Sequence, residues 1–312
     1  IKYLSLAKSL DPLNADTRRL LGIAFYRIGE TEDALNEEMV ALYLTPRNSE
    51  VHYYLARTFA ELGADSLALK HVRKAIKLKP RPEYRLFEAY LLVTGLKFRE
   101  AIRKLKSMEE DLNPPGYYLL GTAYFGLEKY RNALKYFRKA SELDTANYHY
   151  KRTVAELLEQ LGEKEKALDI LEKMSESYPD STELKFRMAM LLAELDEMAR
   201  AESLFALIVQ EDSTDAAAYN NWGYFLATRG GDLDSAQKLV AKALELEPDN
   251  PLYLDSIGWI YFLKGDYRTA FDYVKRAVEG GVRDPEILEH MGEILLKLGQ
   301  KEEALKYFRQ AL

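Results

Sequence analysis

Residues 21–46, LGIAFYRIGETEDALNEEMVALYLTP, decide the fold of this chain. They place a small residue at Gly22, an aromatic ring at Phe25, small residues again at Ala34 and Ala41, and a proline at Pro46. The same order of small, aromatic and small residues returns along the sequence at a nearly constant period. The stretch therefore belongs to one unit of an internal repeat, and the period of that repeat is the first property to establish.

The central alanine of this unit recurs at spacings of 32 to 35 residues, as Ala34, Ala68, Ala101, Ala133, Ala167, Ala201, Ala236, Ala270 and Ala304. Twelve residues before each of them, thirteen in one unit, stands a glycine or another alanine. We therefore expect one array over 1–312: a half unit over 1–14 and full units over 15–48, 49–81, 82–113, 114–147, 148–181, 182–215, 216–250, 251–284 and 285–312.

Each unit has the pattern of two amphipathic helices. In 51–62 and 66–78 the apolar residues recur at i, i+3, i+4 and i+7, which is the spacing of one helix face. The small residues allow the two helices of a unit to cross closely. Glycines at one repeat position are expected to close the first helix in the left-handed conformation: Gly29, Gly63, Gly162, Gly230, Gly265 and Gly299. A single pair cannot bury its apolar faces, so neighbouring units must stack.

A 34-residue period with Leu-Gly-x-x-Phe/Tyr followed by two alanines and a proline resembles the tetratricopeptide repeat. Leu21-Gly22, Phe25, Ala34, Ala41 and Pro46 carry the resemblance, which extends over essentially the whole chain. It implies an all-α, right-handed superhelical solenoid of antiparallel helix pairs, with about 17 helices. The short spacings place an irregular junction near 82–116, marked by Pro114-Pro115-Gly116.

Composition and motifs argue against catalysis within these 312 residues. The chain has no cysteine, which excludes disulfides, thiolate metal sites and a cysteine nucleophile. It has no phosphate-binding glycine loop and no His-Glu-x-x-His metal motif. His290, which lies between Glu289 and Glu293, is interpreted as a helix-surface histidine. We expect no enzyme activity, no cofactor and no metal.

In the tetratricopeptide family the first helix of each unit lines a concave groove, and this resemblance directs the search for binding residues. The corresponding positions hold many of the 22 tyrosines, whose rings offer rigid contact area with a polar tip. The alternative is that these rings only pack the inside of the superhelix. The predicted groove residues are Tyr26, Tyr53, Arg57, Tyr90, Tyr118, Phe125, Arg152, Phe186, Asn220, Tyr224, Trp259 and Phe262.

Charge is unevenly distributed along the chain. The formal net charge is -6, yet residues 64–106 hold 12 Lys and Arg against 4 Asp and Glu. Most of these cations lie on predicted second helices, where a solvated face is expected and nucleic-acid binding is the lesser alternative.

The sequence thus predicts a scaffold that binds a protein or peptide segment in an aromatic groove, with no small-molecule substrate and no membrane insertion. The alternatives are the substrate-docking region of a larger enzyme and part of a bacterial envelope assembly or secretion complex. Self-association through uncapped ends is a further expectation. The expected location is the bacterial cytoplasm or periplasm, the latter as a lipoprotein fragment without its signal.

Overall fold

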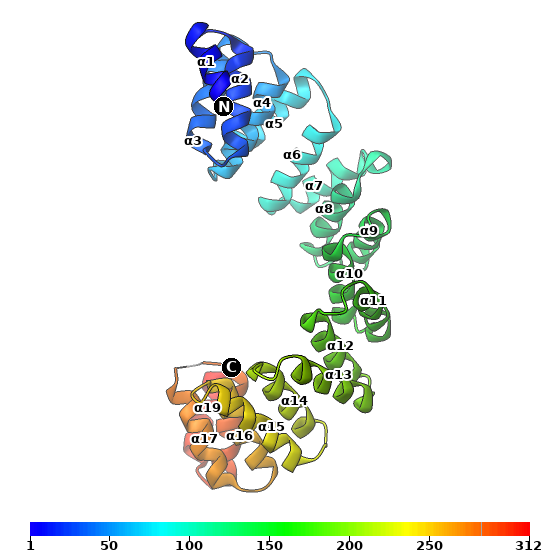
Figure 1. Ribbon diagram of the computed structural model, residues 1–312, viewed down its shortest axis with the longest axis vertical. Helices are drawn as coiled ribbons and strands as arrows, with labels where there is room; N and C mark the ends of the chain where they lie inside the picture. Colours follow the sequence, from blue (N-terminus) through cyan, green and yellow to red (C-terminus); the bar gives the residue numbers. More distant parts are fainter. Residues whose placement is uncertain (282) are drawn as a thin grey trace. The chain divides into compact units, whose positions relative to one another are not determined.

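A computed structural model describes residues 1–281 and 283–312. Within these residues the chain forms nineteen α-helices and no strand, which confirms the all-α prediction (Figure 1). The expected number was about seventeen; the difference arises because nine helix pairs, rather than eight, follow the first helix. The chain divides into two compact units, unit 1 over Ile1–Glu163 and unit 2 over Lys164–Leu312.

Unit 1 consists of ten α-helices and one short 3₁₀ helix in its described residues. In chain order they are α1 (Lys2–Leu10), α2 (Ala15–Arg27), α3 (Thr31–Leu44), α4 (Ser49–Glu61), α5 (Asp65–Leu78), α6 (Pro82–Thr94), α7 (Phe98–Lys106), η1 (Glu109–Asp111), α8 (Pro114–Phe125), α9 (Tyr130–Leu143) and α10 (Tyr148–Gln160).

Unit 2 is built in the same way over the residues described. Its helices are α11 (Lys164–Ser177), α12 (Thr182–Glu194), α13 (Met198–Glu211), α14 (Ala216–Thr228), α15 (Leu233–Leu246), α16 (Pro251–Leu263), α17 (Tyr267–Glu279), α18 (Pro285–Lys297) and α19 (Lys301–Ala311). We call the even-numbered helices first helices and the odd-numbered ones second helices.

The small residues of the repeat lie where two helices cross. All nine alanines that define the period are fully buried, with no exposed surface. A Cβ atom added to Gly258 of α16 would lie 2.5 Å from Val274 Cγ2 of α17, and one on Gly223 would lie 2.6 Å from Val240 Cγ2. Both distances are too short for carbon atoms, so only hydrogen fits at these crossings, as the sequence predicts.

A left-handed residue ends the first helix of all nine pairs. The six predicted glycines have φ between 70° and 84°. In the other three pairs the same position is held by Leu96, Glu128 and Asp196, with φ of 56°, 58° and 61°. The left-handed conformation is thus set by the helix-to-helix turn itself, even where the side chain opposes it.

The second helix α7 is short. It spans nine residues, against fourteen in α5 and α9, and the 3₁₀ helix η1 follows it. Pro114 and Pro115 then form the first turn of α8, which Asn113 caps by accepting from the backbone N–H of Gly116 at 3.0 Å. The irregular segment that follows α7 therefore ends at Asn113, one residue before Pro114.

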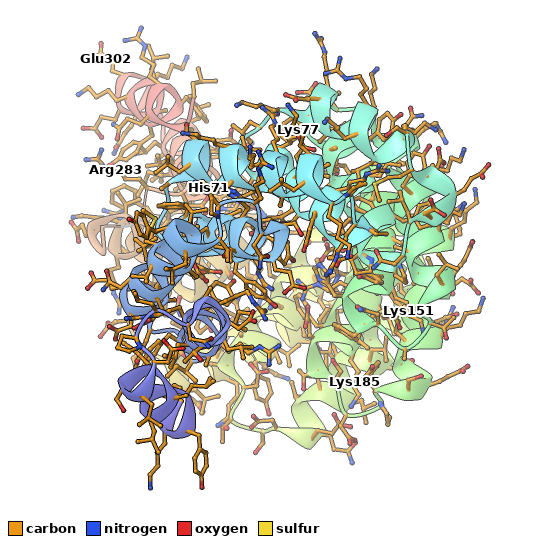
Figure 2. All side chains as sticks on the ribbon, turned by 90° about the horizontal axis from the view of Figure 1, so that it is seen from above. His71, Lys77, Lys151, Lys185, Arg283 and Glu302 are labelled. Atoms are coloured by element: carbon orange, nitrogen blue, oxygen red, sulfur yellow. The ribbon has the colours of Figure 1, made fainter. Side chains whose placement is uncertain are left out.

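Buried charged side chains link neighbouring helices. Glu37 of α3 accepts from Lys8 and from Arg18, the latter at 2.8 Å. Lys185 of α12 is buried and pairs with Glu211 of α13. Lys77 of α5, in contrast, is exposed; both lysines are labelled in Figure 2.

Glu38 is the exception among the buried charges. Its side chain is 1% exposed, and neither carboxylate oxygen has a hydrogen-bond partner among the described residues. Burial raises the pKa of Glu38 to about 7. This carboxyl group is therefore partly protonated near neutral pH.

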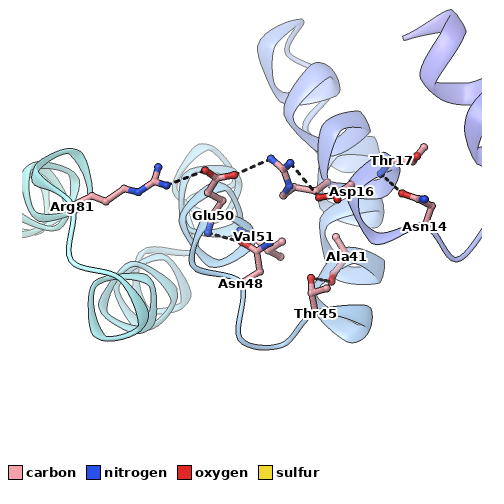
Figure 3. A network of polar contacts seen from close by, with 10 residues as sticks. Asn14, Asp16, Thr17, Ala41, Thr45, Asn48, Glu50, Val51 and Arg81 are labelled. Atoms are coloured by element: carbon pink, nitrogen blue, oxygen red, sulfur yellow. Dashed lines mark hydrogen bonds and ion pairs between the residues drawn. The ribbon is translucent and has the colours of Figure 1, made fainter.

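Polar side chains fix the starts of the first helices. Asn14 accepts from the N–H of Thr17 at 2.9 Å and begins α2, and Asn48 begins α4 in the same way (Figure 3). Glu50 of α4 lies between two arginines, 2.9 Å from Arg19 of α2 and 3.3 Å from Arg81 at the start of α6. These ion pairs join the starts of three successive first helices.

Candidate functional site

The first helices of unit 1 line a cavity of about 600 Å³, which we call the aromatic groove. It contains five of the predicted site residues: Tyr26, Tyr53, Arg57, Tyr90 and Tyr118. The complete lining is Tyr26 of α2; Tyr53, Arg57 and Glu61 of α4; Glu83, Leu86, Phe87 and Tyr90 of α6; Pro115, Tyr118 and Leu119 of α8; and Tyr150 of α10.

Arg57 lies at one end of the aromatic groove, held between two rings. Its guanidinium carbon is 4.7 Å from the ring centroid of Tyr26 and 5.8 Å from that of Tyr53, within the range of cation–π attraction. The Tyr26 hydroxyl lies 3.2 Å from Glu61 Oε1. These contacts fix the direction of the guanidinium group while leaving it partly exposed.

The rings of α6 continue the surface. Phe87 meets Tyr53 edge-on with 5.7 Å between centroids and stacks on Tyr90 at 5.9 Å. Tyr90 is 45% exposed, so this ring presents much of its surface to solvent. A ligand that covers it removes apolar area from water, which is the main source of affinity at such surfaces.

Tyr118 of α8 marks the other end of the aromatic groove. Its hydroxyl lies 2.8 Å from His149 Nε2, and its ring stacks on Tyr150 with 5.2 Å between centroids. Burial raises the pKa of Tyr26 and of Tyr53, so both hydroxyls stay protonated at neutral pH; Tyr26 donates to Glu61, whereas Tyr53 can donate to a ligand. The aromatic groove thus offers apolar contact area, hydroxyl donors and one oriented cation.

Sequence reasoning missed several of the lining residues. All the predicted groove residues lie three positions before the small residue of a first helix, or one or four positions after it. The groove also takes Phe87 and Leu119 from two positions before it, and Glu83 and Pro115 from six positions before it. These positions continue the same i, i+3, i+4 stripe towards the start of the helix, which was the signal that could have found them.

In unit 2 the predicted residues Tyr224, Trp259 and Phe262 gather on α14 and α16. Trp259 stacks between Phe262, at 4.5 Å, and His290 of α18, at 3.9 Å between centroids. The Tyr224 hydroxyl donates to Glu286 Oε1 of α18. Burial and then the Glu286 carboxylate raise the pKa of Tyr224 far above its usual range, which keeps this donor protonated.

Two predictions of exposed side chains in unit 2 are wrong. Asn220 was expected at an exposed groove position but is only 7% exposed, because α14 packs against both α15 and α16. Its Oδ1 atom is buried without a partner among the described residues. His290 was interpreted as a surface histidine, yet it is buried under Trp259 and bonded to Asp255.

The remaining predicted residues join neither group. Phe125 is 41% exposed and meets Tyr130 edge-on at 5.3 Å. Arg152 pairs with Glu156 within α10 at 2.8 Å. Phe186 of α12 meets Phe205 of α13 edge-on at 6.0 Å. Each of these side chains therefore already contacts a residue of its own helix or of the next helix in the chain.

Part of the basic stretch is neutralised by nearby carboxylates. Arg73 of α5 binds Glu88 at 2.9 Å and Glu100 at 2.7 Å, and Lys104 also reaches Glu88 at 3.2 Å. Lys106 pairs with Glu109 at 2.6 Å. Arg73 and Lys104 thereby join α5, α6 and α7.

The described residues also bear on metals and membranes. Over 1–281 and 283–312 no group of three or more His, Asp or Glu side chains is placed to hold a metal ion. None of the helices in that part of the chain combines the length and the apolar character of a membrane span.

Family models agree with this architecture. A model described as a tetratricopeptide repeat matches residues 21–175, and one described as subunit 3 of the anaphase-promoting complex, or cyclosome, matches residues 230–311. The chain is a tetratricopeptide repeat protein. The architecture of such an array is that of a protein–protein interaction scaffold.

Relatives of this tetratricopeptide protein carry similar descriptions. The repeat-containing protein PA4667 of Pseudomonas aeruginosa is 32% identical over 139 residues, which cover 45% of this chain and 23% of that protein. The repeat-containing protein YpiA of Bacillus subtilis is 23% identical over 98% of this chain and 81% of its own length. This chain thus spans about a quarter of PA4667 and most of YpiA.

A solved structure shows the same fold. The crystal structure of a tetratricopeptide repeat protein from Parabacteroides merdae superposes with a TM-score of 0.59, at 19% identity, covering 84% of this chain and 91% of that one.

Proposed function

We propose that this chain is a non-enzymatic scaffold that binds an extended protein segment in the aromatic groove of unit 1. The observation that carries the proposal is the partly exposed row of rings across four first helices, from Tyr26 to Tyr118, with Arg57 oriented among them. An extended segment suits a row of rings on parallel helices, because alternate side chains can rest on successive rings.

The chemistry of the lining narrows the class of segment. The rings favour apolar or aromatic side chains, and the tyrosine hydroxyls can bond to backbone groups. Arg57 can donate to an acceptor such as a carboxylate or a carbonyl oxygen of the ligand. The favoured ligand is therefore an apolar segment that carries one acceptor near the Arg57 end.

A peptide-library experiment tests the proposal. Peptides of random sequence would be selected on the wild-type protein, and the affinity of the best binder would be measured for Arg57→Ala and Tyr90→Ala by calorimetry. Each variant is expected to lose about 2 kcal/mol, roughly 30-fold in Kd, as for a central anchor. Tyr43→Ala is the matched control, because Tyr43 is an 85% exposed tyrosine on α3 that does not line the aromatic groove.

Stability measurements separate binding from folding. Because Tyr90 is 45% exposed, its loss should change the free energy of unfolding by less than about 1 kcal/mol. A peptide whose affinity is the same for wild type, Arg57→Ala and Tyr90→Ala would place binding elsewhere. A steep fall of affinity with salt would point to charged surfaces instead of rings.

A further inference from the structure

A second cavity, of about 400 Å³, lies beside α5, and every side chain that lines it is basic. We call it the basic pocket; it is lined by His52 of α4 and by Lys70, His71, Arg73, Lys74 and Lys77 of α5. His71 and Lys77 mark the helix in Figure 2. Lys70, Lys74 and Lys77 fall at i, i+4 and i+7 and therefore share one face of α5.

The three lysines are not committed to carboxylates. Within the described residues no ion pair is formed by Lys70, Lys74 or Lys77, whereas Arg73 is held by Glu88 of α6 and Glu100 of α7. Three like charges on one helix face repel one another, which weakens the folded state unless a negative group joins them. The basic pocket thus combines open volume, lined mainly by the carbon stems of these side chains, with three lysine charges that have no carboxylate partner among the described residues.

Two histidines form the floor of the basic pocket. His52 Nδ1 lies 3.1 Å from His71 Nδ1, and His52 Nε2 lies 3.2 Å from the carbonyl oxygen of Pro46. A carbonyl oxygen only accepts, so His52 Nε2 carries the hydrogen, and in the neutral ring Nδ1 is the acceptor. His71 must then donate from Nδ1, which leaves His71 Nε2 unprotonated and without a partner among the described residues.

The positive charges around the two histidines determine whether the basic pocket binds a cation or an anion. Two histidine nitrogens 3.1 Å apart could chelate a metal ion, but a cation would meet the charges of Lys70, Lys74 and Lys77 with no carboxylate in the lining. An anion gains from the same charges. Burial first, and then His52 and Lys70, lower the pKa of His71 to about 4, so this ring is neutral at pH 7 and can take up a proton when an anion arrives.

We propose that the basic pocket binds a multiply charged oxyanion of the phosphate or sulfate class, held by Lys70, Lys74 and Lys77 and by the protonated Nε2 of His71. The new proton enters at Nε2, so the hydrogen bond from His71 Nδ1 to His52 Nδ1 persists. The pocket lies on α4 and α5 away from the residues of the aromatic groove, and its function does not depend on that groove.

Protonation of His71 gives binding a pH dependence of known sign. The bound anion raises the pKa of His71, so the complex takes up a proton at a higher pH than the free protein does. Affinity therefore rises as pH falls from 7 towards 4, below which both states are protonated. The titratable and charged groups near His71 are the neutral His52 on α4 and the cations of α5, with Glu88 and Glu100 reaching Arg73 from α6 and α7.

Sulfate is the first probe, because it remains a dianion over this range. The imidazole resonances of His71 would be followed by NMR during sulfate titrations at pH 7 and pH 5. We expect Nε2 of His71 to become protonated with sulfate and the affinity to rise by about threefold to tenfold at the lower pH. His71→Gln should bind with little pH dependence. Sulfate that leaves the His71 resonances unchanged overturns the proposal.

A matched pair of variants tests the lysines. Lys70→Gln with Lys74→Gln should weaken sulfate binding at least about tenfold, since two of the pocket charges are lost. Lys135→Gln with Lys139→Gln is the control, because these lysines occupy the same two repeat positions on α9 and removing them changes the net charge equally. Equal losses in both double variants would show non-specific attraction and overturn the proposal.

The source of the oxyanion is decided by two further probes. If a phosphoserine peptide binds at least about tenfold more tightly than inorganic phosphate while its serine counterpart does not bind, the anion is carried by a protein partner. If inorganic phosphate binds as tightly as the peptide, a free anion is the ligand. If sulfate, phosphate and the phosphoserine peptide all fail to bind, at pH 7 as well as at pH 5, the pocket is not an oxyanion site.

Discussion

His290 Nδ1 of α18 lies 2.9 Å from Asp255 Oδ2 of α16; both side chains are buried, and the His290 ring stacks on the Trp259 ring. Burial raises the pKa of Asp255 even though the hydrogen bond with His290 acts in the opposite direction. The pair holds the imidazole flat against the indole, so three residues on two first helices form one packed element of unit 2.

Trp259→Ala should therefore act on stability. The indole stacks on both Phe262 and His290, so its loss leaves a gap and exposes the pair beneath. We expect the free energy of unfolding to fall by about 3 kcal/mol in chemical denaturation. Tyr90→Ala in unit 1 serves as the comparison and should change it by less than about 1 kcal/mol. Equal effects of the two substitutions would contradict the packing role of Trp259.

Glu38 should make stability depend on pH. Its pKa is about 7 in the folded chain, compared with 4.5 for an ordinary glutamate, so the folded state binds the proton more tightly. The free energy of unfolding should then fall as pH rises from 4.5 to 7, by about 3 kcal/mol in total. In Glu38→Gln this fall should disappear, and the variant should be more stable than wild type at pH 8.

The control for this experiment is Glu32→Gln, because Glu32 is an exposed glutamate on the same helix α3. It should retain the pH dependence of the wild type. Parallel curves for wild type and Glu38→Gln between pH 4.5 and 7 would show that burial does not perturb Glu38.

Leu96→Gly should stabilise the chain. Leu96 has φ of 56° and is 75% exposed, so its side chain opposes the turn while contributing little packing. Relief of the left-handed conformation outweighs the extra freedom of glycine in the unfolded chain by on the order of 0.5 kcal/mol. Thermal unfolding measures the gain. The reciprocal change Gly63→Leu, at the same repeat position with φ of 70°, should cost about 1 kcal/mol.

Ala270→Leu should destabilise unit 2 by at least about 1–3 kcal/mol. Ala270 is fully buried where α17 crosses α16, and its carbonyl oxygen would lie 3.2 Å from a Cβ on Gly258, so there is no room for a larger side chain nearby. Ala217→Leu is the control, because Ala217 is exposed on α14. If the two substitutions gave the same midpoint of denaturation, the crossing would not be closely packed.

The fold was predictable because each unit repeats one packing rule. Small residues such as Ala34 and Gly258 could be read as helix crossings, since only they permit the approach that the structure shows. The left-handed conformation of Leu96, Glu128 and Asp196 could not be predicted from residue type, because their side chains do not favour it. Their repeat position, which they share with the six glycines, is the signal that locates them.

The candidate site was predictable in part. A fixed repeat position finds residues on the middle of each first helix, such as Tyr53 and Arg57. It does not find Glu83 or Pro115 near a helix start, because the lining follows the whole helical stripe. Nor could it show that His290 is buried, since that depends on the Trp259 ring of another helix.

Tyr224 of α14 donates a hydrogen bond to Glu286 of α18. A ligand of unit 2 must therefore displace this bond before it can bind the Tyr224 hydroxyl. A molecule approaching these residues exchanges an existing contact for a new one, so its enthalpy gain is only the difference between the two. Binding at Tyr224 also requires this side chain to rotate away from Glu286, which lowers the association rate. Phe87 and Tyr90 of the aromatic groove form no side-chain hydrogen bond among the described residues, so a ligand that covers these two rings requires no such opening and its encounter depends on diffusion and orientation.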